Sequence, residues 1–195
     1  EAFEDTGVAL PEKKRKRAKE ILDLTQTLSQ EFNRRLRENQ DKLVFNKAEQ
    51  KGLPESYLQR VTRDDNGNIV VGFNYPEVFP FLTHAEDEEA RERYYRAFLN
   101  RGGDRNIDIL DELVKLRKEL AGLYDLPSYA HYVTQRRMVG NPETVHNFLD
   151  SVESVVREIE KEDLRQLREL KAQHIEEPDV EDVDVYAWDK EFYLE

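Results

Sequence analysis

The chain has 195 residues, and its 42 acidic and 30 basic side chains give a net charge of −12. This balance argues against nucleic acid and against an anionic membrane surface as main partners, because both need clustered Lys and Arg. The absence of cysteine excludes a disulfide framework and a thiolate zinc site. Nine Tyr and nine Phe argue against disorder, despite a mean hydropathy of −0.85.

The two ends of the sequence predict a fragment of a longer protein. Residues 1–10 contain neither an initiator Met nor the basic and apolar regions of a signal peptide. No stretch approaches 18 consecutive apolar residues, so we predict no transmembrane helix and a cytoplasmic location. The last residue, Glu195, falls inside a predicted helix.

The first long helix is predicted from Pro11 to about Asn39, because proline fits the first helical position. Its apolar residues recur at helical spacing: Ala18, Ile21, Leu22, Thr25, Leu28, Phe32 and Leu36. The basic run Lys13–Arg17 fits either a nuclear-localisation or nucleic-acid patch or the solvated face of this helix. The acidic net charge favours the solvated face.

A small β-hairpin is predicted over about residues 60–73, because Asn66-Gly67 stands between two β-branched runs. A lone hairpin is marginal in water, so it must pack on helices or pair with a strand outside this chain. Lys42–Phe45 is a weaker strand candidate, and Pro54 starts a short helix. We interpret the aromatic and proline-rich residues 74–82 as a buried linker, with a peptide-binding surface as the alternative.

The stretch Asp104–Val133 is the organising centre of the predicted fold. Its apolar residues follow helical spacing: Ile109, Leu113, Leu116, Leu120 and Leu123. Asn106 is the predicted N-cap, and the helix stops before Pro127 because the residue preceding a proline avoids the α region. Ser128 then opens a second short helix, which completes a helical hairpin. A helix capped by Asp87 precedes this stretch.

The last long helix is predicted to run from Asn141-Pro142, a cap followed by a first-turn proline, to about His174. One side carries an apolar stripe: Val145, Leu149, Val152, Val155 or Val156, Ile159, Leu164, Leu167 and Leu170. A standalone coiled coil is the alternative, but the stripe drifts off a strict heptad. The acidic residues 176–185 lack the glycine and terminal glutamate of an EF-hand loop, which favours a solvated loop over a cation site. Tyr186–Tyr193 begins an aromatic helix that contains the only Trp.

The sequence contains no recognisable catalytic motif. None of its four histidines forms HExxH, in which two His at i and i+4 hold zinc: His84, His131, His146 and His174. No Cys-x-x-Cys follows the two His-x-Glu pairs to complete a deaminase-type site, and no G-x-S-x-G occurs. We interpret His131 as a half-buried histidine bonded to a neighbour. We therefore predict no catalytic and no metal-binding residue in this chain, and leave the substrate-binding residues unassigned.

These patterns together predict a mainly α fold, a multi-helix array of long antiparallel helices with one small β-hairpin. We treat residues 1–195 as a single helical fragment of a larger protein. Residues 1–50 hold the long N-terminal helix and a short strand, and residues 51–82 hold the short helix, hairpin and aromatic linker. Residues 83–175 form the helical core, and residues 176–195 the acidic loop and the start of a further helix.

Several short stretches occur in one order along nearly the whole chain: Gly7–Glu12, Leu28–Phe32, Lys51–Pro54, the hairpin, Asn74–Pro76, Arg91 with Tyr94 and Tyr95, Leu116–Ala121, Tyr129–Tyr132, Asn141–Glu143, and Trp188-Asp189 with Phe192-Tyr193. Each stretch is a weak signal alone. In this order they resemble the thimet-oligopeptidase family of zinc metallopeptidases, which includes oligopeptidase A and peptidyl-dipeptidase-like enzymes.

The resemblance implies a mostly helical two-lobed peptidase that cuts short peptides in a deep channel. Zinc is held there by HExxH and a downstream Glu, and the Glu of HExxH activates water. Since this sequence contains no HExxH, no catalytic or metal residue carries over. We expect the chain to form part of the helical channel wall, to hold no zinc itself, and to be inactive without the missing catalytic lobe.

Two other functions stay open at this point. The chain could be a standalone helical module that binds a partner helix or peptide along Tyr75–Leu82, or a degenerate relative that has lost the metal site. If the chain is a peptidase fragment, the hairpin and the Trp188 helix should expose apolar surface meant for the missing lobe. Self-association of the fragment would then cover that surface.

Overall fold

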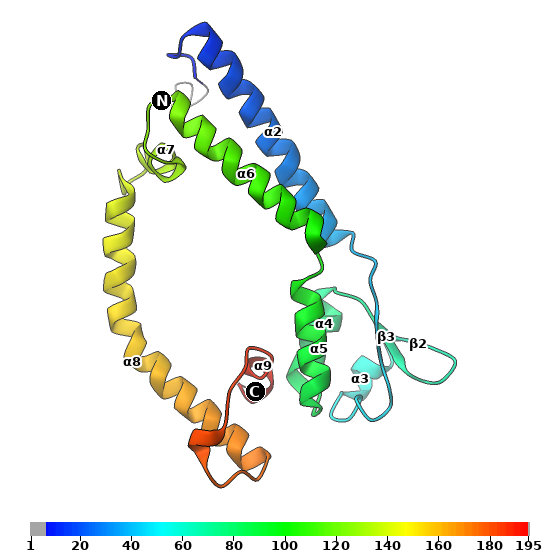
Figure 1. Cartoon of the computed structure of the whole chain (residues 1–195). Helices are drawn as coiled ribbons and strands as arrows, with labels where there is room; N and C mark the ends of the chain where they lie inside the picture. The colour runs from blue at the N-terminus through cyan, green and yellow to red at the C-terminus, as the bar shows by residue number, and fades with distance from the viewer. Residues whose placement is uncertain (1–6, 195) are drawn as a thin grey trace. The chain divides into compact units, whose positions relative to one another are not determined.

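The computed structural model describes residues 7–194, which are mainly helical with one small antiparallel sheet (Figure 1). This confirms the predicted fold class. Two compact units can be distinguished, one formed by Glu1–Glu38 with Gly102–Val155 and the other by Asn39–Arg101 with Val156–Glu195. No helix among the described residues has the length and apolar content needed to cross a bilayer.

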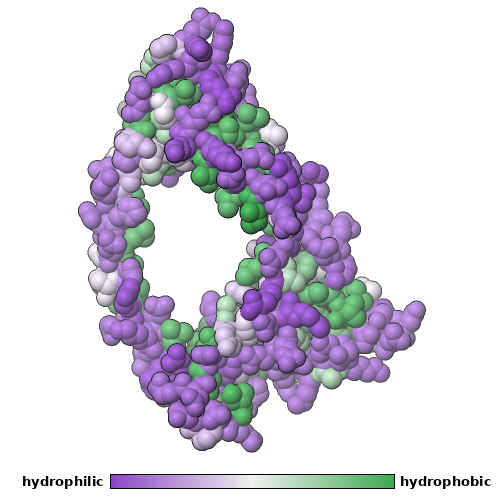
Figure 2. Space-filling model, in the orientation of Figure 1, coloured by the Kyte–Doolittle hydropathy of each residue, from purple (hydrophilic) through white to green (hydrophobic). Residues whose placement is uncertain are grey.

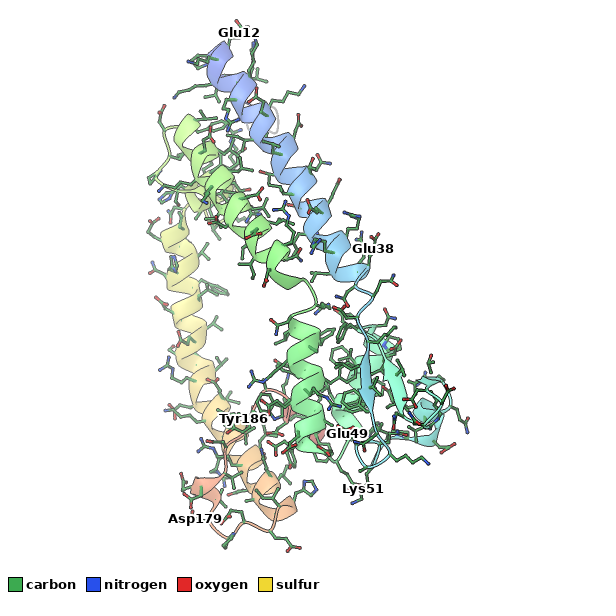
Figure 3. The ribbon with its side chains drawn as sticks, turned by 45° about the vertical axis from the view of Figure 1, so that its right-hand side comes forward. Glu12, Glu38, Glu49, Lys51, Asp179 and Tyr186 are labelled. Carbon is green, nitrogen blue, oxygen red and sulfur yellow. The ribbon has the colours of Figure 1, made fainter. Side chains whose placement is uncertain are left out.

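The first unit is built on two long helices, α2 (Glu12–Arg37) and α6 (Gly103–Leu123). Glu12 and the residue that follows the helix, Glu38, mark the two ends of α2 in Figure 3. α2 begins directly after Pro11, one residue later than predicted, so that Pro11 occupies the cap position and not the first helical position. A short helix, α7 (Tyr129–Thr134), follows α6.

The helices α2 and α6 run antiparallel, and their apolar stripes face each other. Ion pairs join opposite ends: Arg17 Nε lies 2.6 Å from Glu119 Oε1, and Arg105 Nε lies 3.2 Å from Glu31 Oε1. Along this interface, six residues of the predicted stripes are buried in two clusters: Ala18, Ile21 and Leu120, and Leu28, Ile109 and Leu113. The central stretch thus finds its packing partner in the first long helix.

The prediction of Asn106 as a helix cap is wrong. α6 begins before this residue, and the buried side chain of Asn106 donates from Nδ2 to the backbone oxygen of Phe32 on α2 at 3.2 Å. A tertiary hydrogen bond therefore takes the place of the predicted local one. The cap of α7 is confirmed, since the Ser128 side chain accepts a hydrogen bond from the His131 backbone.

The long helix α8 spans Pro142–His174, as predicted. Asn141 Oδ1 accepts a hydrogen bond from the backbone N–H of Thr144 at 2.8 Å, so the predicted asparagine cap and first-turn proline both act. Much of the apolar stripe of α8 is exposed: Leu149, Val152, Val155, Val156, Ile159, Leu164 and Leu170. Figure 2 shows hydrophobic patches along this helix.

The second unit contains a three-stranded antiparallel sheet of β1 (Leu43–Phe45), β2 (Thr62–Arg63) and β3 (Ile69–Val71), in the order β1-β3-β2. Phe45 pairs with Ile69 across β1 and β3. Gly67 adopts a φ of +81° in the predicted turn between β2 and β3. The hairpin therefore pairs with the weaker strand candidate of this same chain, and not with an outside strand.

The sheet packs on the helices α4 (Tyr75–His84) and α5 (Glu88–Leu99). The prediction of a linker over residues 74–82 is wrong, because these residues form α4. Pro76 near the helix start removes no needed donor, and Pro80 removes one hydrogen bond while one face of α4 enters the core through three residues: Val78, Phe81 and Leu82. Burial of that face outweighs the proline penalty.

The expectation of exposed apolar surface on the hairpin is wrong. Ile69 and Val71 are fully buried, together with Phe45, Tyr57 and Tyr94. In the Trp188 segment the expectation holds in part, because the Trp188 side chain is buried whereas Tyr186 and Leu194 are 43% and 60% exposed. The sheet of this chain thus completes its own core, whereas α8 and the Trp188 segment expose apolar side chains.

Candidate functional site

A buried ion pair joins two segments of the second unit that lie 98 residues apart in sequence. Arg91 of α5 donates from Nη2 to Asp189 Oδ1 at 2.9 Å, and the two side chains are 1% and 0% exposed. Arg91 Nη1 also donates to the backbone oxygens of Ala85 and Glu86 at 2.8 and 3.1 Å. Its guanidinium carbon lies 4.1 Å from the centre of the Phe192 ring. One side chain therefore ties the α4–α5 junction to residues 189–192.

Lys171 of α8 supplies a second cation to the same carboxylate. Its Nζ donates to Asp189 Oδ2 at 2.7 Å and to Glu88 Oε1 at 2.8 Å. Burial alone would lower the pKa of Lys171, but these hydrogen bonds outweigh burial and raise the pKa of its ammonium above the ordinary value. The four groups of this charge network, Glu88, Arg91, Lys171 and Asp189, carry two positive and two negative charges and thus balance each other.

The charge network also decides where the last helix begins. Asp189 Oδ2 accepts a hydrogen bond from the Tyr186 backbone at 3.0 Å, and Trp188 Nε1 donates to Glu88 Oε1 at 3.4 Å. Residues 187–189 therefore form a turn, and α9 spans only Lys190–Tyr193. The predicted aromatic helix from Tyr186 is wrong at its start, because the Asp189 carboxylate holds the backbone of the preceding residues.

An apolar groove of about 470 Å³ lies beside the charge network, between α8 and residues 185–194. α8 lines one wall with four aliphatic side chains: Val156, Ile159, Leu164 and Leu167. The other wall is formed by Val185, Tyr186, Ala187 and Leu194. Tyr186 is labelled in Figure 3 close to the last turns of α8. Its hydrogen bond to Asp189 fixes this wall, so the groove depends on the charge network.

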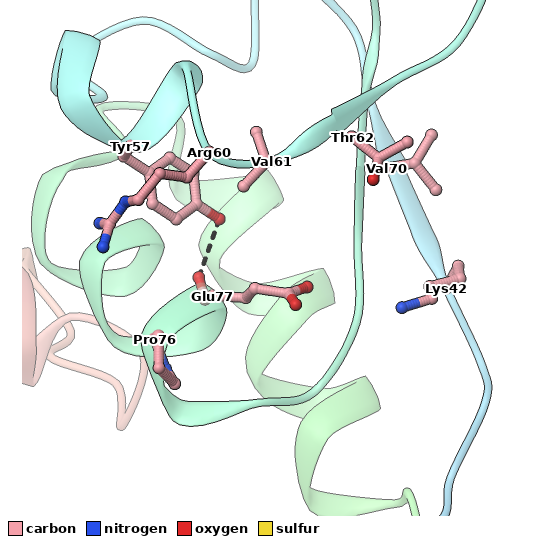
Figure 4. A pocket seen from close by; sticks show the side chains of 8 residues that line it. All are labelled: Lys42, Tyr57, Arg60, Val61, Thr62, Val70, Pro76 and Glu77. Carbon is pink, nitrogen blue, oxygen red and sulfur yellow. Dashed lines mark hydrogen bonds between the residues drawn. The ribbon is translucent and has the colours of Figure 1, made fainter.

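A second, more polar pocket of about 230 Å³ lies among α3 (Glu55–Leu58), the sheet and α4 (Figure 4). Tyr57 donates its hydroxyl proton to the backbone oxygen of Glu77 at 2.8 Å, and the Glu77 carboxylate accepts from the Gly72 backbone. Burial raises the pKa of Tyr57 above its ordinary value. The Tyr57 hydroxyl and the Glu77 carboxylate are thus engaged in holding the fold together.

Two of the four histidines have local hydrogen-bond partners. His131 is half-buried, and its Nδ1 lies 2.9 Å from Ser128 Oγ, as its sequence context predicts. His174 Nδ1 lies 2.9 Å from the hydroxyl of Tyr193. Within residues 7–194, no three His, Cys, Asp or Glu side chains gather as metal ligands would, and this range includes the acidic residues 176–185. The described residues therefore do not fit a zinc centre, and the lack of catalytic residues stays a prediction.

Sequence reasoning alone did not find the charge network or the groove. Helical periodicity reports only neighbours three or four residues apart, whereas Arg91 and Asp189 are 98 residues apart. The available signal lay in the resemblance, because Arg91 with Tyr95 and Trp188-Asp189 belong to two of its stretches. The structure joins these stretches twice, through the Arg91–Asp189 pair and through the rings of Tyr95 and Trp188, whose centres lie 6.4 Å apart.

Comparison with known proteins points in the same direction. Oligopeptidase A of Haemophilus influenzae is 31% identical over 99% of this chain, and saccharolysin of Saccharomyces cerevisiae is 29% identical over 96%. Oligopeptidase A of Escherichia coli is 29% identical over 85%. The chain spans only 30%, 27% and 27% of the lengths of these three relatives.

A family model covers the part of the chain that contains the whole charge network. The model describes peptidase family M3 and matches residues 81–195, which is more than half of the chain. Glu88, Arg91, Lys171 and Asp189 all fall inside this match. Relatives of this family also align over nearly the full length of the chain. Because the family model matches more than half of the chain, the chain belongs to peptidase family M3.

Proposed function

We propose that this chain is part of a zinc-dependent oligopeptidase that hydrolyses short peptides. In this proposal the chain forms part of the helical wall of the substrate channel. The observation that carries the proposal is the family match over residues 81–195. The relatives' names, oligopeptidase A and saccharolysin, support peptides as the substrate class. The chain accounts for at most 30% of the length of these two relatives, which supports a role as one part of a larger enzyme.

The assignment to the wall rests on the side chains that are present. A catalytic zinc needs three protein ligands such as His and Glu around one open position, and the described residues offer no such group. The sequence also contains no HExxH. Zinc would therefore be held by the catalytic lobe, which is this chain's proposed partner, and no bond-breaking step is assigned to residues of this chain.

The decisive experiment is to sequence the gene on both sides of the codons for residues 1–195. We expect an HExxH motif downstream, followed by a further Glu codon. A stop codon soon after that of Glu195, with no HExxH elsewhere in the gene, would overturn the proposal.

Activity measurements test whether catalysis requires the parts of the enzyme outside this chain. The purified chain should not hydrolyse an internally quenched peptide, whereas the full gene product should do so in a chelator-sensitive manner. Chelator-sensitive hydrolysis by the purified chain alone would refute the wall assignment.

A standalone peptide- or helix-binding module is the second candidate function. It is favoured by two exposed rings of α4, Tyr75 and Phe79, whose centres lie 5.3 Å apart. Most of the predicted aromatic surface is not available, because Val78, Phe81 and Leu82 are buried in the core. A gene that ends near codon 195 would favour this candidate over the oligopeptidase.

A further inference from the structure

The apolar groove between α8 and residues 185–194 combines exposed aliphatic side chains with acidic ones. Val156, Ile159 and Leu164 line it while 46%, 59% and 43% exposed. Three aliphatic side chains left in water on one wall of a concave surface are typical of a site that is covered when a ligand binds. The volume of about 470 Å³ suits a few side chains of a short peptide.

Two carboxylates line the same groove, Glu160 and Asp163 of α8. They are three residues apart, so both project from one face of the helix. In the described part of the chain, neither forms an ion pair or a side-chain hydrogen bond.

The neighbouring carboxylates of α8 outside the groove behave differently. Glu158 pairs with Lys161 at 2.7 Å, Glu162 pairs with Arg165 at 2.6 Å, and Glu169 pairs with Arg165 as well. Over this stretch of the helix, the acidic residues that line the groove are thus the ones without a cation. A ligand that brings a cation to this rim would meet two carboxylates with no competing partner.

The charges of the groove favour a cationic peptide over other occupants. Lys190 is the one basic lining residue, and it lies 3.8 Å from Glu191. A second copy of the chain would bring two acidic rims together, which costs free energy through like-charge repulsion. Phosphate-rich ligands are disfavoured for the same reason.

We propose that this groove binds a short peptide segment in which an aliphatic residue stands beside a lysine or arginine. The aliphatic side chain enters between Ile159 and Tyr186, and the cation pairs with Glu160 and Asp163. This inference deepens the proposed function, on which it rests for peptides as the ligand class. Binding at the groove requires no catalysis, so it can be measured on this chain itself.

The charge network prepares the groove for binding. Asp189 holds the Tyr186 backbone at 3.0 Å, and Lys171 Nζ lies 5.0 Å from the centre of the Tyr186 ring. A wall that is already ordered costs the complex less conformational entropy on binding.

Fluorescence polarisation with the purified chain and labelled, end-capped pentapeptides tests the proposal. The three probes share one sequence, Gly-Leu-X-Leu-Gly, with Lys, Gln or Glu at X. At low salt we expect the Lys peptide to bind about fivefold more tightly than the Gln peptide and the Glu peptide most weakly, since exposed ion pairs contribute modestly. High salt should reduce this preference.

Matched variants locate the binding site. The double variant Glu160→Gln/Asp163→Asn should lose the preference for the Lys peptide over the Gln peptide. It should still bind the Gln peptide. The control, Glu158→Gln with Glu162→Gln, removes the same charge from paired positions outside the groove and should leave the preference intact. Ile159→Asn should weaken the binding of all three peptides, because the exposed Ile159 side chain supplies apolar contact in the groove.

Several outcomes would overturn the proposal. Equal affinity for the Lys and Glu peptides, or no binding up to about 1 mM, would remove the basis for a cation-selective groove. A dimer in sedimentation that Ile159→Asn dissolves would assign the groove to a second copy. Loss of peptide binding in the full gene product would assign it to another part of that protein. A gene without HExxH would refute the proposed function and leave the binding result standing.

Discussion

Arg91 and Asp189 form a fully buried ion pair across 98 residues of sequence, with Nη2 and Oδ1 2.9 Å apart. Lys171 completes the pairing of Asp189, and the pair holds the turn before α9 against α5 and α8. Both partners fall inside the part of the chain that matches peptidase family M3. The ion pair thus couples the start and the end of the family-matching region within one unit.

Arg91→Met should strongly destabilise the second unit. The substitution leaves the buried Asp189 carboxylate without one of its two cations, which lowers the free energy of unfolding by about 3–5 kcal/mol. Urea unfolding followed by the fluorescence of Trp188, the only Trp and a neighbour of the network, measures this cost. The double variant Arg91→Met/Asp189→Leu should recover part of it, because it removes both charges.

The control for this prediction is Lys161→Gln. It breaks the exposed pair with Glu158 on α8 and should cost less than ~0.5 kcal/mol. Equal costs for Arg91→Met and Lys161→Gln would contradict the role given to the buried pair.

Gly52→Ala should be more destabilising than Gly103→Ala. Both glycines have positive φ, at +85° and +62°, so an alanine costs about 1–2 kcal/mol at either position. Only at Gly52 would the new Cβ also lie 2.2 Å from a backbone oxygen, that of His84. Since the backbone around residues 51–53 must then move away from the end of α4, we expect an unfolding midpoint well below that of Gly103→Ala.

Above neutral pH, the stability of the second unit should fall only when the pH becomes strongly alkaline. Burial raises the pKa of the Tyr94 and Tyr57 hydroxyls above the ordinary value of 10. The unfolded chain loses these protons first, so the contribution is complete below about pH 10 and is lost as the pH rises further. The raised pKa of Lys171 acts in the same direction, starting from its ordinary value of 10.5.

Urea unfolding between about pH 8 and pH 11 measures this dependence. Tyr94→Phe should make the free energy of unfolding depend less on pH in this range. Near neutral pH the variant should lose about 1 kcal/mol of stability, because the Gly72 backbone oxygen loses the 2.5 Å hydrogen bond from the Tyr94 hydroxyl. A loss of stability already complete by about pH 9 would be inconsistent with these buried phenols.

Ile21→Ala should destabilise the pairing of α2 and α6. The Ile21 side chain is fully buried against Leu120, and truncation of such a residue costs about 2–5 kcal/mol through lost burial and a residual cavity. Ile107→Ala on α6 is the control, because Ile107 is 68% exposed and should change stability by less than ~0.5 kcal/mol. Hydrogen exchange of the α2 and α6 backbone amides measures the effect of both variants. Similar exchange rates in Ile21→Ala and Ile107→Ala would refute the packing of Ile21 between α2 and α6.

The sequence alone determined the features that depend on neighbours along the chain. The Asn141-Pro142 start of α8, the Asp87 and Ser128 caps and the Asn66-Gly67 turn were predictable, because a cap or turn joins residues two to four positions apart. The family resemblance was also readable, because it rests on short stretches in a fixed order.

Tertiary structure decided the features that depend on distant residues. Residues 75–84 became helical despite two prolines because one face of α4 is buried in the core. The Asn106 side chain does not cap its own helix but donates a hydrogen bond to the backbone of α2. Arg91 pairs with an aspartate 98 residues away. That aspartate also accepts a hydrogen bond from the backbone of Tyr186, which lines one wall of the groove. Such contacts gain their free energy from burial and desolvation, which depend on how the whole unit packs and leave no periodic trace in the sequence.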